Sequence, residues 1–322
     1  NPLDDRNKPI ESIFDAYLAT LGVTQSVDVS AQPSYPRTRD RTHEFDDVRI
    51  RLFEFIELHE CGLGELIGSR NGPLGKTMVA SSRWYYERQL ELGLRACEQR
   101  LRSRSKKSNL DTIEKLEVWR KLKTSALKKS AWNASLGSNE LAHAMAFPAG
   151  SLGRKELEST RFGAPLSASF KKLETVLGHA EPAPQELASL HEALYELSST
   201  RQAGAIIRAA ALLTPRLRAA NRELNRIHNC EIVNALFYDT YIAHLHAPLG
   251  QLVRAGKSLQ EDLVALKHLV GAPPGQNYTK YWATVIDSPD QQALLQRFLS
   301  LFGEHTQTWT RVLDRCQIAV HR

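Results

Sequence analysis

The sequence predicts an all-α fold: a single multi-helix bundle of long antiparallel helices, braced by two disulfides. Apolar residues recur at three- and four-residue spacing through most of the 322-residue chain, which is the pattern of helices with one buried face. Strand-like alternation is confined to Val27–Val29. The chain also contains four cysteines, an even number that suits two crosslinks.

The N-terminal region, residues 1–43, is expected to form a helix followed by an extended arm. The arm corresponds to residues 22–36, whose prolines disfavour a continuing helix. We expect residues 1–322 to form one all-helical domain, because both halves carry long amphipathic faces that need partners. A weak internal boundary is predicted near residues 178–184, where one glycine and two prolines interrupt the pattern.

Three helices are predicted in the next part of the chain. The first covers Glu44–Arg70, and the second covers Ser82–Arg102. Ser108 is followed three residues later by Asp111, which resembles a capping box and predicts the start of the third helix. The apolar residues that define the first helix are Phe45, Val48, Leu52, Phe55, Ile56, Leu63, Leu66 and Ile67, and those of the third are Ile113, Leu116, Trp119 and Leu122.

The C-terminal half shows further helical periodicity. Helices are predicted over residues 163–177, 185–197, 203–228, 232–246 and 249–270. Pro248 is expected to separate the last two, because proline disrupts a helix interior. The run from Ser288 to Gln291 combines a cap, a proline, an acidic residue and a capping-box glutamine, so it predicts the start of a final helix that runs toward Cys316.

The four cysteines have none of the spacings of zinc fingers, haem attachment sites or thioredoxin-like motifs. Three pairings into two disulfides are possible. We favour Cys61 with Cys97 and Cys230 with Cys316, because each pair links neighbouring predicted helices. Four buried thiols are the alternative, and an oxidising compartment would favour the disulfides.

The net charge of +6 is concentrated in one segment. Between Arg95 and Lys129 the chain has twelve Lys and Arg against four Asp and Glu. The candidates to face phosphates of anionic lipid or nucleic acid are Lys106, Lys107, Lys115, Arg120, Lys121, Lys123, Lys128 and Lys129. A solvated helical face is the competing interpretation, since Trp119 and Trp132 suit core packing as well as base stacking.

No sequence motif points to a cofactor or a metal, and we expect neither. The run Gly72–Thr77 ends like a phosphate-binding loop, but Arg70 stands where that motif needs glycine. His244 and His246 would point to different sides of an α-helix, which disfavours joint metal ligation. A hydrolase-like enzyme with a cleft between helical halves, using His244, His246 and Glu231, is an alternative function.

The run from Cys61 to Cys97 carries a resemblance to a known family. Its distinctive residues are Cys61, Gly62, Leu63, Gly64, Glu65, Leu66, Ile67, Arg70, Asn71, Gly72, Pro73, Leu74, Gly75, Lys76, Ser82, Tyr86, Glu87 and Cys97; a looser C-terminal match comprises Cys230, Tyr241, His246, Pro248, Leu249, Trp309 and Cys316. This pattern resembles an uncharacterised family of proteobacterial lipoproteins, domain of unknown function three-zero-eight-zero, over nearly the whole chain.

The resemblance implies export, a lipid-modified cysteine just before Asn1, and attachment to a membrane facing the periplasm, expected to be the outer membrane. It implies no activity. A start at Asn1 without methionine suits a chain whose leader has been removed, and equally a domain cut from a cytosolic protein. We therefore expect a non-enzymatic module that binds an envelope protein or an anionic lipid. Nucleic-acid binding is the weakest interpretation for an exported protein, and the sequence does not indicate an oligomeric state.

The expected binding surface lies between Arg70 and Tyr86, in a long loop held by the first disulfide. Its candidate residues are Arg70, Asn71, Lys76 and Tyr86, and His244 and His246 are further candidates. A purely structural role competes with this interpretation: Arg70 and Asn71 would cap a helix, with Gly72 in the left-handed conformation, and Tyr86 would lock the loop.

Overall fold

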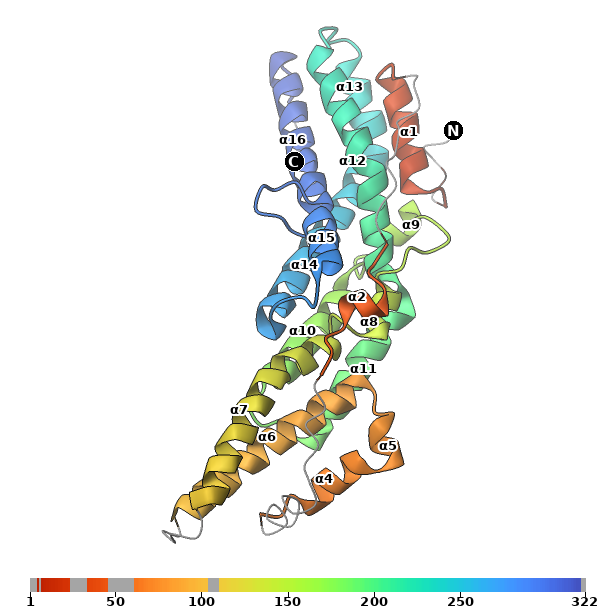
Figure 1. Ribbon diagram of the computed structural model, residues 1–322. Helices are drawn as coiled ribbons and strands as arrows, with labels where there is room; N and C mark the ends of the chain where they lie inside the picture. Colours follow the sequence, from red (N-terminus) through yellow and green to blue (C-terminus); the bar gives the residue numbers. More distant parts are fainter. Residues whose placement is uncertain (1–4, 6, 24–33, 46–60, 104–109, 320–322) are drawn as a thin grey trace.

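The computed structural model describes residues 5, 7–23, 34–45, 61–103 and 110–319. These residues are predominantly helical (Figure 1), and the extended pairing among them is limited to one antiparallel bridge between Pro9 and Gly153. The all-α prediction is confirmed. In order, the helices are α1 (Ile10–Thr20), α2 (Thr38–Arg41), α4 (Gly64–Asn71), α5 (Pro73–Lys76), α6 (Ala80–Ser103), α7 (Leu110–Asn133), α8 (Asn139–Ala144), α9 (Arg154–Leu157), α10 (Ala164–Gly178), α11 (Pro184–Thr200), α12 (Gln202–Arg226), α13 (Val233–Ala235), the π-helix η2 (Leu236–His246), α14 (Ala247–Val270), α15 (Gln276–Val285) and α16 (Leu294–Arg315).

The body of the molecule forms around α12, most of whose residues are buried. Helices α1, α14 and α16 contact it directly. Small side chains allow this close packing, and one position requires glycine: a Cβ on Gly204 would lie 2.1 Å from the carbonyl oxygen of Ala146. Residues of α10, α11 and α14 extend the same hydrophobic core, which therefore spans most of the chain.

Helices α6 and α7 form a hairpin that projects from the body (Figure 1). With α4 it has a small apolar cluster of its own, made of Leu63, Ile67, Tyr86, Leu90, Leu94, Cys97 and Leu116. Ion pairs also join the two helices: Lys123 Nζ lies 2.8 Å from Glu87 Oε2, and Arg120 Nε lies 3.1 Å from Glu98 Oε2. Buried apolar residues and buried charge together stabilise the hairpin.

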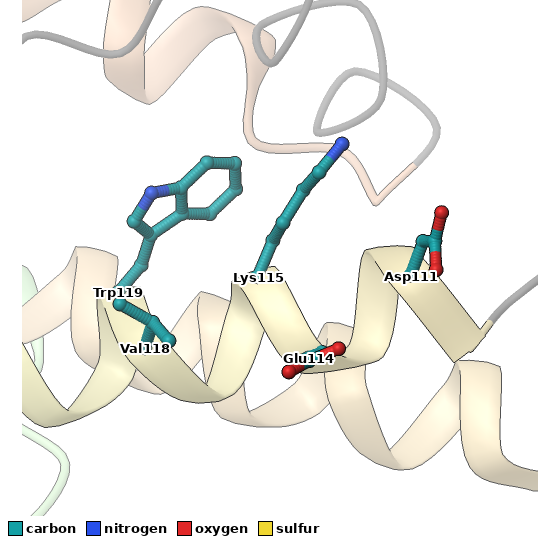
Figure 2. A pocket seen from close by; sticks show the side chains of 5 residues that line it. All are labelled: Asp111, Glu114, Lys115, Val118 and Trp119. Atoms are coloured by element: carbon teal, nitrogen blue, oxygen red, sulfur yellow. The ribbon is translucent and has the colours of Figure 1, made fainter.

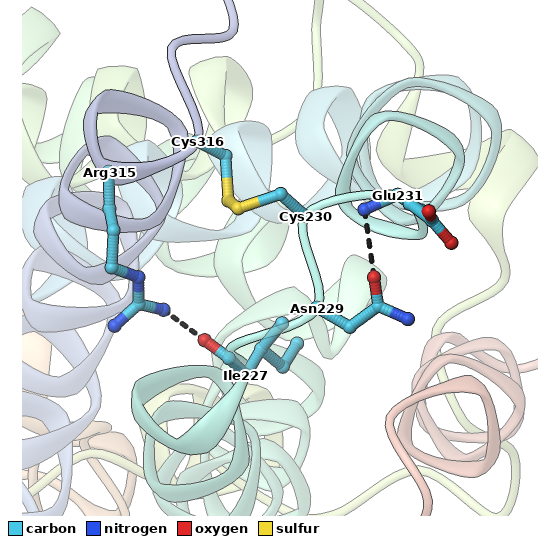
Figure 3. The surroundings of a disulfide bond; sticks show 6 residues. All are labelled: Ile227, Asn229, Cys230, Glu231, Arg315 and Cys316. Atoms are coloured by element: carbon cyan, nitrogen blue, oxygen red, sulfur yellow. Dashed lines mark hydrogen bonds between the residues drawn. A yellow bond between two sulfur atoms is a disulfide. The ribbon is translucent and has the colours of Figure 1, made fainter.

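Both predicted disulfides are present. Cys61 is bonded to Cys97 and Cys230 to Cys316, with Cα atoms 5.4 and 5.3 Å apart. The first disulfide ties the turn before α4 to α6. The second joins the loop after α12 to the end of α16, where Arg315 also donates a hydrogen bond to the carbonyl of Ile227 (Figure 3).

The start predicted for the last helix, at Ser288–Gln291, is wrong. Ser288 Oγ does accept hydrogen bonds from the backbone amides of Gln292 and Ala293, both at 3.0 Å. However, Gln291 has a φ of 59°, which lies outside helical geometry. The capping interactions therefore close a turn, and α16 begins only at Leu294.

The break predicted at Pro248 is also wrong. The π-helix η2 leads directly into α14, with His246 at φ −57° and ψ −50°, and Pro248 lies in the first turn of α14. A proline ring normally clashes with the carbonyl four residues earlier. The wider π-helical turn spaces the preceding carbonyls differently, so the chain continues as a helix through the proline.

The helix predicted from Glu44 to Arg70 is shorter than expected where it can be described. Its part from residue 46 to residue 60 lies outside the described residues, as does the capping box at Ser108. Gly62 has a φ of 78°, in the left-handed region, so the helix cannot run through it and α4 starts at Gly64.

Candidate binding surfaces

The surface predicted from Arg70 to Tyr86 is more compact than the long loop that we expected. Arg70 ends α4 with Asn71, α5 follows at once, and α6 begins at Ala80. Arg70 Nη1 donates to the carbonyl oxygen of Gly75 at 2.5 Å, and a Cβ on Gly75 would lie 2.1 Å from the carbonyl oxygen of Arg70. The arginine therefore closes a tight turn.

Two further residues of this surface differ from the expectation. Tyr86 is only 6% exposed and packs in the hairpin cluster, so its side chain is not presented to a partner. Gly72 is extended, with φ −70° and ψ 168°, rather than left-handed. Asn71 is exposed, and the side chain of Lys76 lies outside what the structure describes. The geometry favours a structural role for Arg70 and Tyr86.

His244 lies in η2 and is held by Arg154. The Nη1 atom of Arg154 donates to Nδ1 of His244 at 3.0 Å, which leaves the proton of a neutral imidazole on Nε2. The same guanidinium donates to the carbonyl of Ala243 at 3.0 Å and to Glu158 Oε1 at 2.6 Å. These contacts fix α9 against η2.

The residues proposed for an alternative hydrolase are not brought together by any contact among the described residues. His246 is exposed, and its ring centroid lies 5.8 Å from that of Tyr241. Glu231 is also exposed, and its backbone amide donates to Asn229 Oδ1 (Figure 3). His244 pairs with an arginine instead. Within the described part of the chain, these three side chains therefore form no acid–base pair with one another.

The body contains a buried polar cluster that the sequence did not indicate. His305 Nδ1 lies 2.7 Å from Asn221 Oδ1, and its Nε2 lies 3.4 Å from the hydroxyl of Tyr17. Aromatic rings of Tyr241 and Trp309 surround the imidazole. Burial lowers the pKa of His305 to about 3, so the ring is neutral. Because His305 has no solvent exposure, we assign it to the stability of the body.

A polar cavity of about 580 Å³ lies where α2, the end of α7 and the start of α15 meet. Asn277 Nδ2 donates to Asp40 Oδ1 at 2.8 Å, and His43 Nε2 donates to the carbonyl of Ala272 at 3.0 Å. The cavity is lined by Arg39, Asp40, Thr42, His43, Glu44, Lys129, Pro274, Gly275, Gln276 and Asn277. Since these residues come from three distant parts of the sequence, no local motif could have revealed the cavity.

The N-terminal wall of this cavity is fixed firmly to the body. Arg41 is buried and donates to the carbonyl of Gly137 at 3.1 Å, while its own carbonyl accepts from Trp132 Nε1 at 2.8 Å. Tyr35 donates its hydroxyl proton to the carbonyl of Leu136 at 2.6 Å. Trp132 is completely buried, so this indole is unavailable for base stacking.

The basic segment on α7 is partly neutralised within the hairpin. Arg120 and Lys123 pair with acidic residues of α6. Lys115, Lys121, Lys128 and Lys129 remain exposed, whereas Lys106 and Lys107 lie outside the described residues. The cationic surface is therefore smaller than the sequence suggests.

A second pocket, of about 250 Å³, lies along α7. Its described lining consists of Asp111, Glu114, Lys115, Val118 and Trp119 (Figure 2). The side chains of Lys115 and Trp119 rise from α7 in the same direction, and the indole also packs against the hairpin cluster. Trp119 thus contributes to packing and to the pocket wall.

Two further findings concern metals and membranes. Among the described residues, no group of three or more His, Cys, Asp or Glu is placed to hold a metal ion. Of the helices described here, none is both long enough and apolar enough to cross a bilayer.

Comparison with known proteins identifies a family that matches most of the chain. The family model described as "Protein of unknown function (DUF3080)" matches residues 14–320. No curated protein and no solved structure matches the chain. The matched residues extend from α1 to the segment beyond α16, so they include the polar cavity, the hairpin and both disulfides.

Proposed function

Since the chain belongs to the DUF3080 family of proteins of unknown function, we propose that it is a periplasmic lipoprotein that binds another component of the cell envelope. In this proposal a lipid-modified cysteine upstream of Asn1 anchors the protein to the outer membrane. The bound component is a protein or an anionic lipid, and the protein acts as a binding module rather than as an enzyme.

The observation that carries the proposed export is the pairing of all four cysteines. Disulfides persist in oxidising compartments and are rare in the reducing cytosol. Cys230 is exposed, so a cytosolic reductant would have direct access to its bond with Cys316. The fold therefore suits the periplasm.

The polar cavity between α2, α7 and α15 supports the proposed binding role. Its volume of about 580 Å³ falls in the range typical of ligand sites, about 300–1,000 Å³. The lining holds two basic residues, Arg39 and Lys129, and two acidic residues, Asp40 and Glu44, and Arg39 Nε lies 3.9 Å from Asp40 Oδ2. The N-terminus of α15 adds the positive end of a helix dipole, which favours an anionic group. Asp40 is already bonded to Asn277. A lipid phosphate or an acidic side chain of a protein partner suits this lining.

Mass spectrometry of the full-length protein, produced in its own cells, tests this proposal. In one variant a photo-crosslinking amino acid replaces Asn277 in the cavity, and in a matched control it replaces the exposed Arg218 on α12. The cells are irradiated, and the protein is analysed intact and as non-reduced peptides. We expect a lipid-modified N-terminal cysteine, both crosslinked cysteine pairs, and an adduct formed from position 277 but not from position 218.

The nature of the adduct separates a lipid from a protein partner. Free thiols together with an unmodified N-terminus would refute export and anchoring. Equal labelling from the two positions would remove the cavity from the proposed binding site, even if the anchor is found.

A further inference from the structure

Two carboxylates with unsatisfied oxygens lie between α10 and α14, inside the body. Asp262 of α14 is only 7% exposed, and its Oδ2 atom is buried without a hydrogen-bond partner among the described residues. Glu174 of α10 is half-buried, and its Oε1 atom is likewise buried without a partner in that part of the chain. A buried carboxylate oxygen normally accepts a hydrogen bond, because an uncompensated charge is costly to remove from water. A donor is therefore missing at this contact.

The packing of the two helices brings these side chains to one place. A Cβ on Gly163, just before α10, would lie 2.9 Å from the Cβ of Ala255 in α14. A Cβ on Gly178, at the end of α10, would lie 3.9 Å from Cδ1 of Leu269. The two helices therefore run side by side in the same direction, and Asp262 lies opposite the middle of α10.

Three polar side chains of α10 share the face that meets Asp262. Ser167, Lys171 and Glu174 are spaced by four and three residues, which places them on one side of the helix. Burial raises the pKa of Glu174, and the negative charge of Asp262 raises it further, whereas Lys171 lowers it. Burial also raises the pKa of Asp262, although a hydrogen bond from Ser167 and the charge of Lys171 lower it. The exposed Glu261 raises it further.

Other charged groups of the neighbouring helices lie elsewhere. On α11, Glu192 accepts from Lys172, which is on a different side of α10 from Glu174. On α7, Lys128 lies beside Gly271, beyond the end of α14. Lys171 is exposed, and neither of the two buried oxygens accepts a hydrogen bond from it.

A single proton can satisfy both oxygens. When two carboxylates occupy one site, one of them keeps a proton and donates it to the other, because two like charges at close range repel. We propose that Glu174 and Asp262 share one proton, so that the contact between α10 and α14 tightens as pH falls and loosens as pH rises. Since α10 also packs against α11, this carboxyl pair makes the junction between α11 and α14 sensitive to pH.

The sign of the effect follows from the raised pKa values. The folded chain keeps the proton at a pH where the unfolded chain has released it, so the pair stabilises the fold at acidic pH. This contribution is lost as pH rises through the raised pKa values. His305 acts in the opposite direction, and for that reason each variant is compared with the wild type at the same pH.

Urea unfolding of the full chain between about pH 5 and pH 8 tests the shared proton. The variants are Asp262→Asn and Glu174→Gln, whose amides keep the size of the side chain and do not ionise. The exposed Glu304→Gln on α16 is the control. At pH 8 each carboxyl variant should have a smaller unfolding constant than the wild type. This advantage should shrink toward pH 5, by up to about tenfold per pH unit, while the control follows the wild type.

The double variant and a direct titration complete the test. Because either amide removes the repulsion, the double variant should gain less than the sum of the two single variants. Carbon-13 NMR of the side-chain carboxyls follows each titration, and Asp262→Asn should lower the pKa of Glu174. Fully additive effects, or a titration of Glu174 that Asp262→Asn leaves unchanged, would overturn the proposal.

An ion pair with Lys171 is the competing explanation for the two oxygens. In that case Asp262→Asn would raise the unfolding constant at pH 8 rather than lower it, and Lys171→Gln would raise it as well. That result would also overturn the shared proton. None of these measurements depends on export or on the polar cavity.

Discussion

His305 couples the stability of the body to pH. It is completely buried between Tyr17 and Asn221, and burial lowers its pKa to about 3 from the ordinary value of 6.5. Below pH 6.5 the unfolded chain binds a proton that the folded chain excludes, so the free energy of unfolding falls as pH decreases toward 3. At about pH 5 this single group should lower the free energy of unfolding by about 2 kcal/mol relative to neutral pH.

We predict that His305→Gln removes this loss of stability. Urea unfolding between pH 7 and pH 5 should give a flatter dependence for the variant than for the wild type, whatever the stability of the variant at pH 7. The exposed His268→Gln is the control and should keep the wild-type slope. Burial raises the pKa of Asp262, so this residue makes the free energy of unfolding rise, rather than fall, as pH decreases. The test therefore compares the pH slope of the variant with the pH slope of the wild type. Identical slopes for His305→Gln and wild type would contradict the prediction.

Two glycines in long helices show how differently the same substitution acts. A Cβ at Gly204, in α12, would lie 2.1 Å from the carbonyl oxygen of Ala146, whereas a Cβ at Gly303, in α16, would meet nothing within 4 Å. We predict that Gly204→Ala lowers the free energy of unfolding by about 1–3 kcal/mol through overpacking. Gly303→Ala should raise it by about 0.5–1 kcal/mol, since alanine favours helices. Chemical denaturation measures both, and equal effects would refute the packing argument.

The helices themselves could largely be predicted from periodicity, but their ends could not. The boundaries of α10, α11 and α12 agree with prediction to within three residues. At Ser288 the capping residues were identified correctly, yet Gln291 takes a positive φ that no sequence signal marks. At Pro248 the helix continues, although a proline is expected to end it. The expected clash with the carbonyl four residues earlier assumes an ordinary α-helical turn, and a π-helix precedes this proline.

The candidate surfaces were harder to predict, because they depend on which segments meet. Tyr86 looked available near the start of a predicted helix, but in α6 its side chain packs into the hairpin cluster and is buried. Arg39, Lys129 and Asn277 line one cavity although they lie far apart in the chain. A single sequence contains no signal that pairs such positions.

The molecule as a whole consists of a large body core and the small hairpin cluster, with one disulfide at each. The Cys61–Cys97 bond belongs to the hairpin cluster, whereas Cys230–Cys316 closes a loop across the body. The body core includes residues from α1 to α16, but the hairpin cluster holds α4 with few buried residues. Regions with few buried contacts open locally at lower free energy than the core. The two disulfides should therefore protect different parts of the structure.

We predict that replacing Cys61 and Cys97 by serine releases α4 while the body stays folded. Limited proteolysis should then cut between Gly64 and Val79 much faster than in the wild type, with little change in the main thermal transition. Replacing Cys230 and Cys316 by serine should instead lower the temperature of that transition. The chain-entropy model for a loop of 86 residues limits the loss in free energy of unfolding to about 4–5 kcal/mol. Wild-type protein in reductant should show both effects, and serine variants should respond little to reductant. If loss of the first disulfide lowers the main transition as much as loss of the second, the hairpin and the body unfold as one cooperative unit, and the division into two protected parts is wrong.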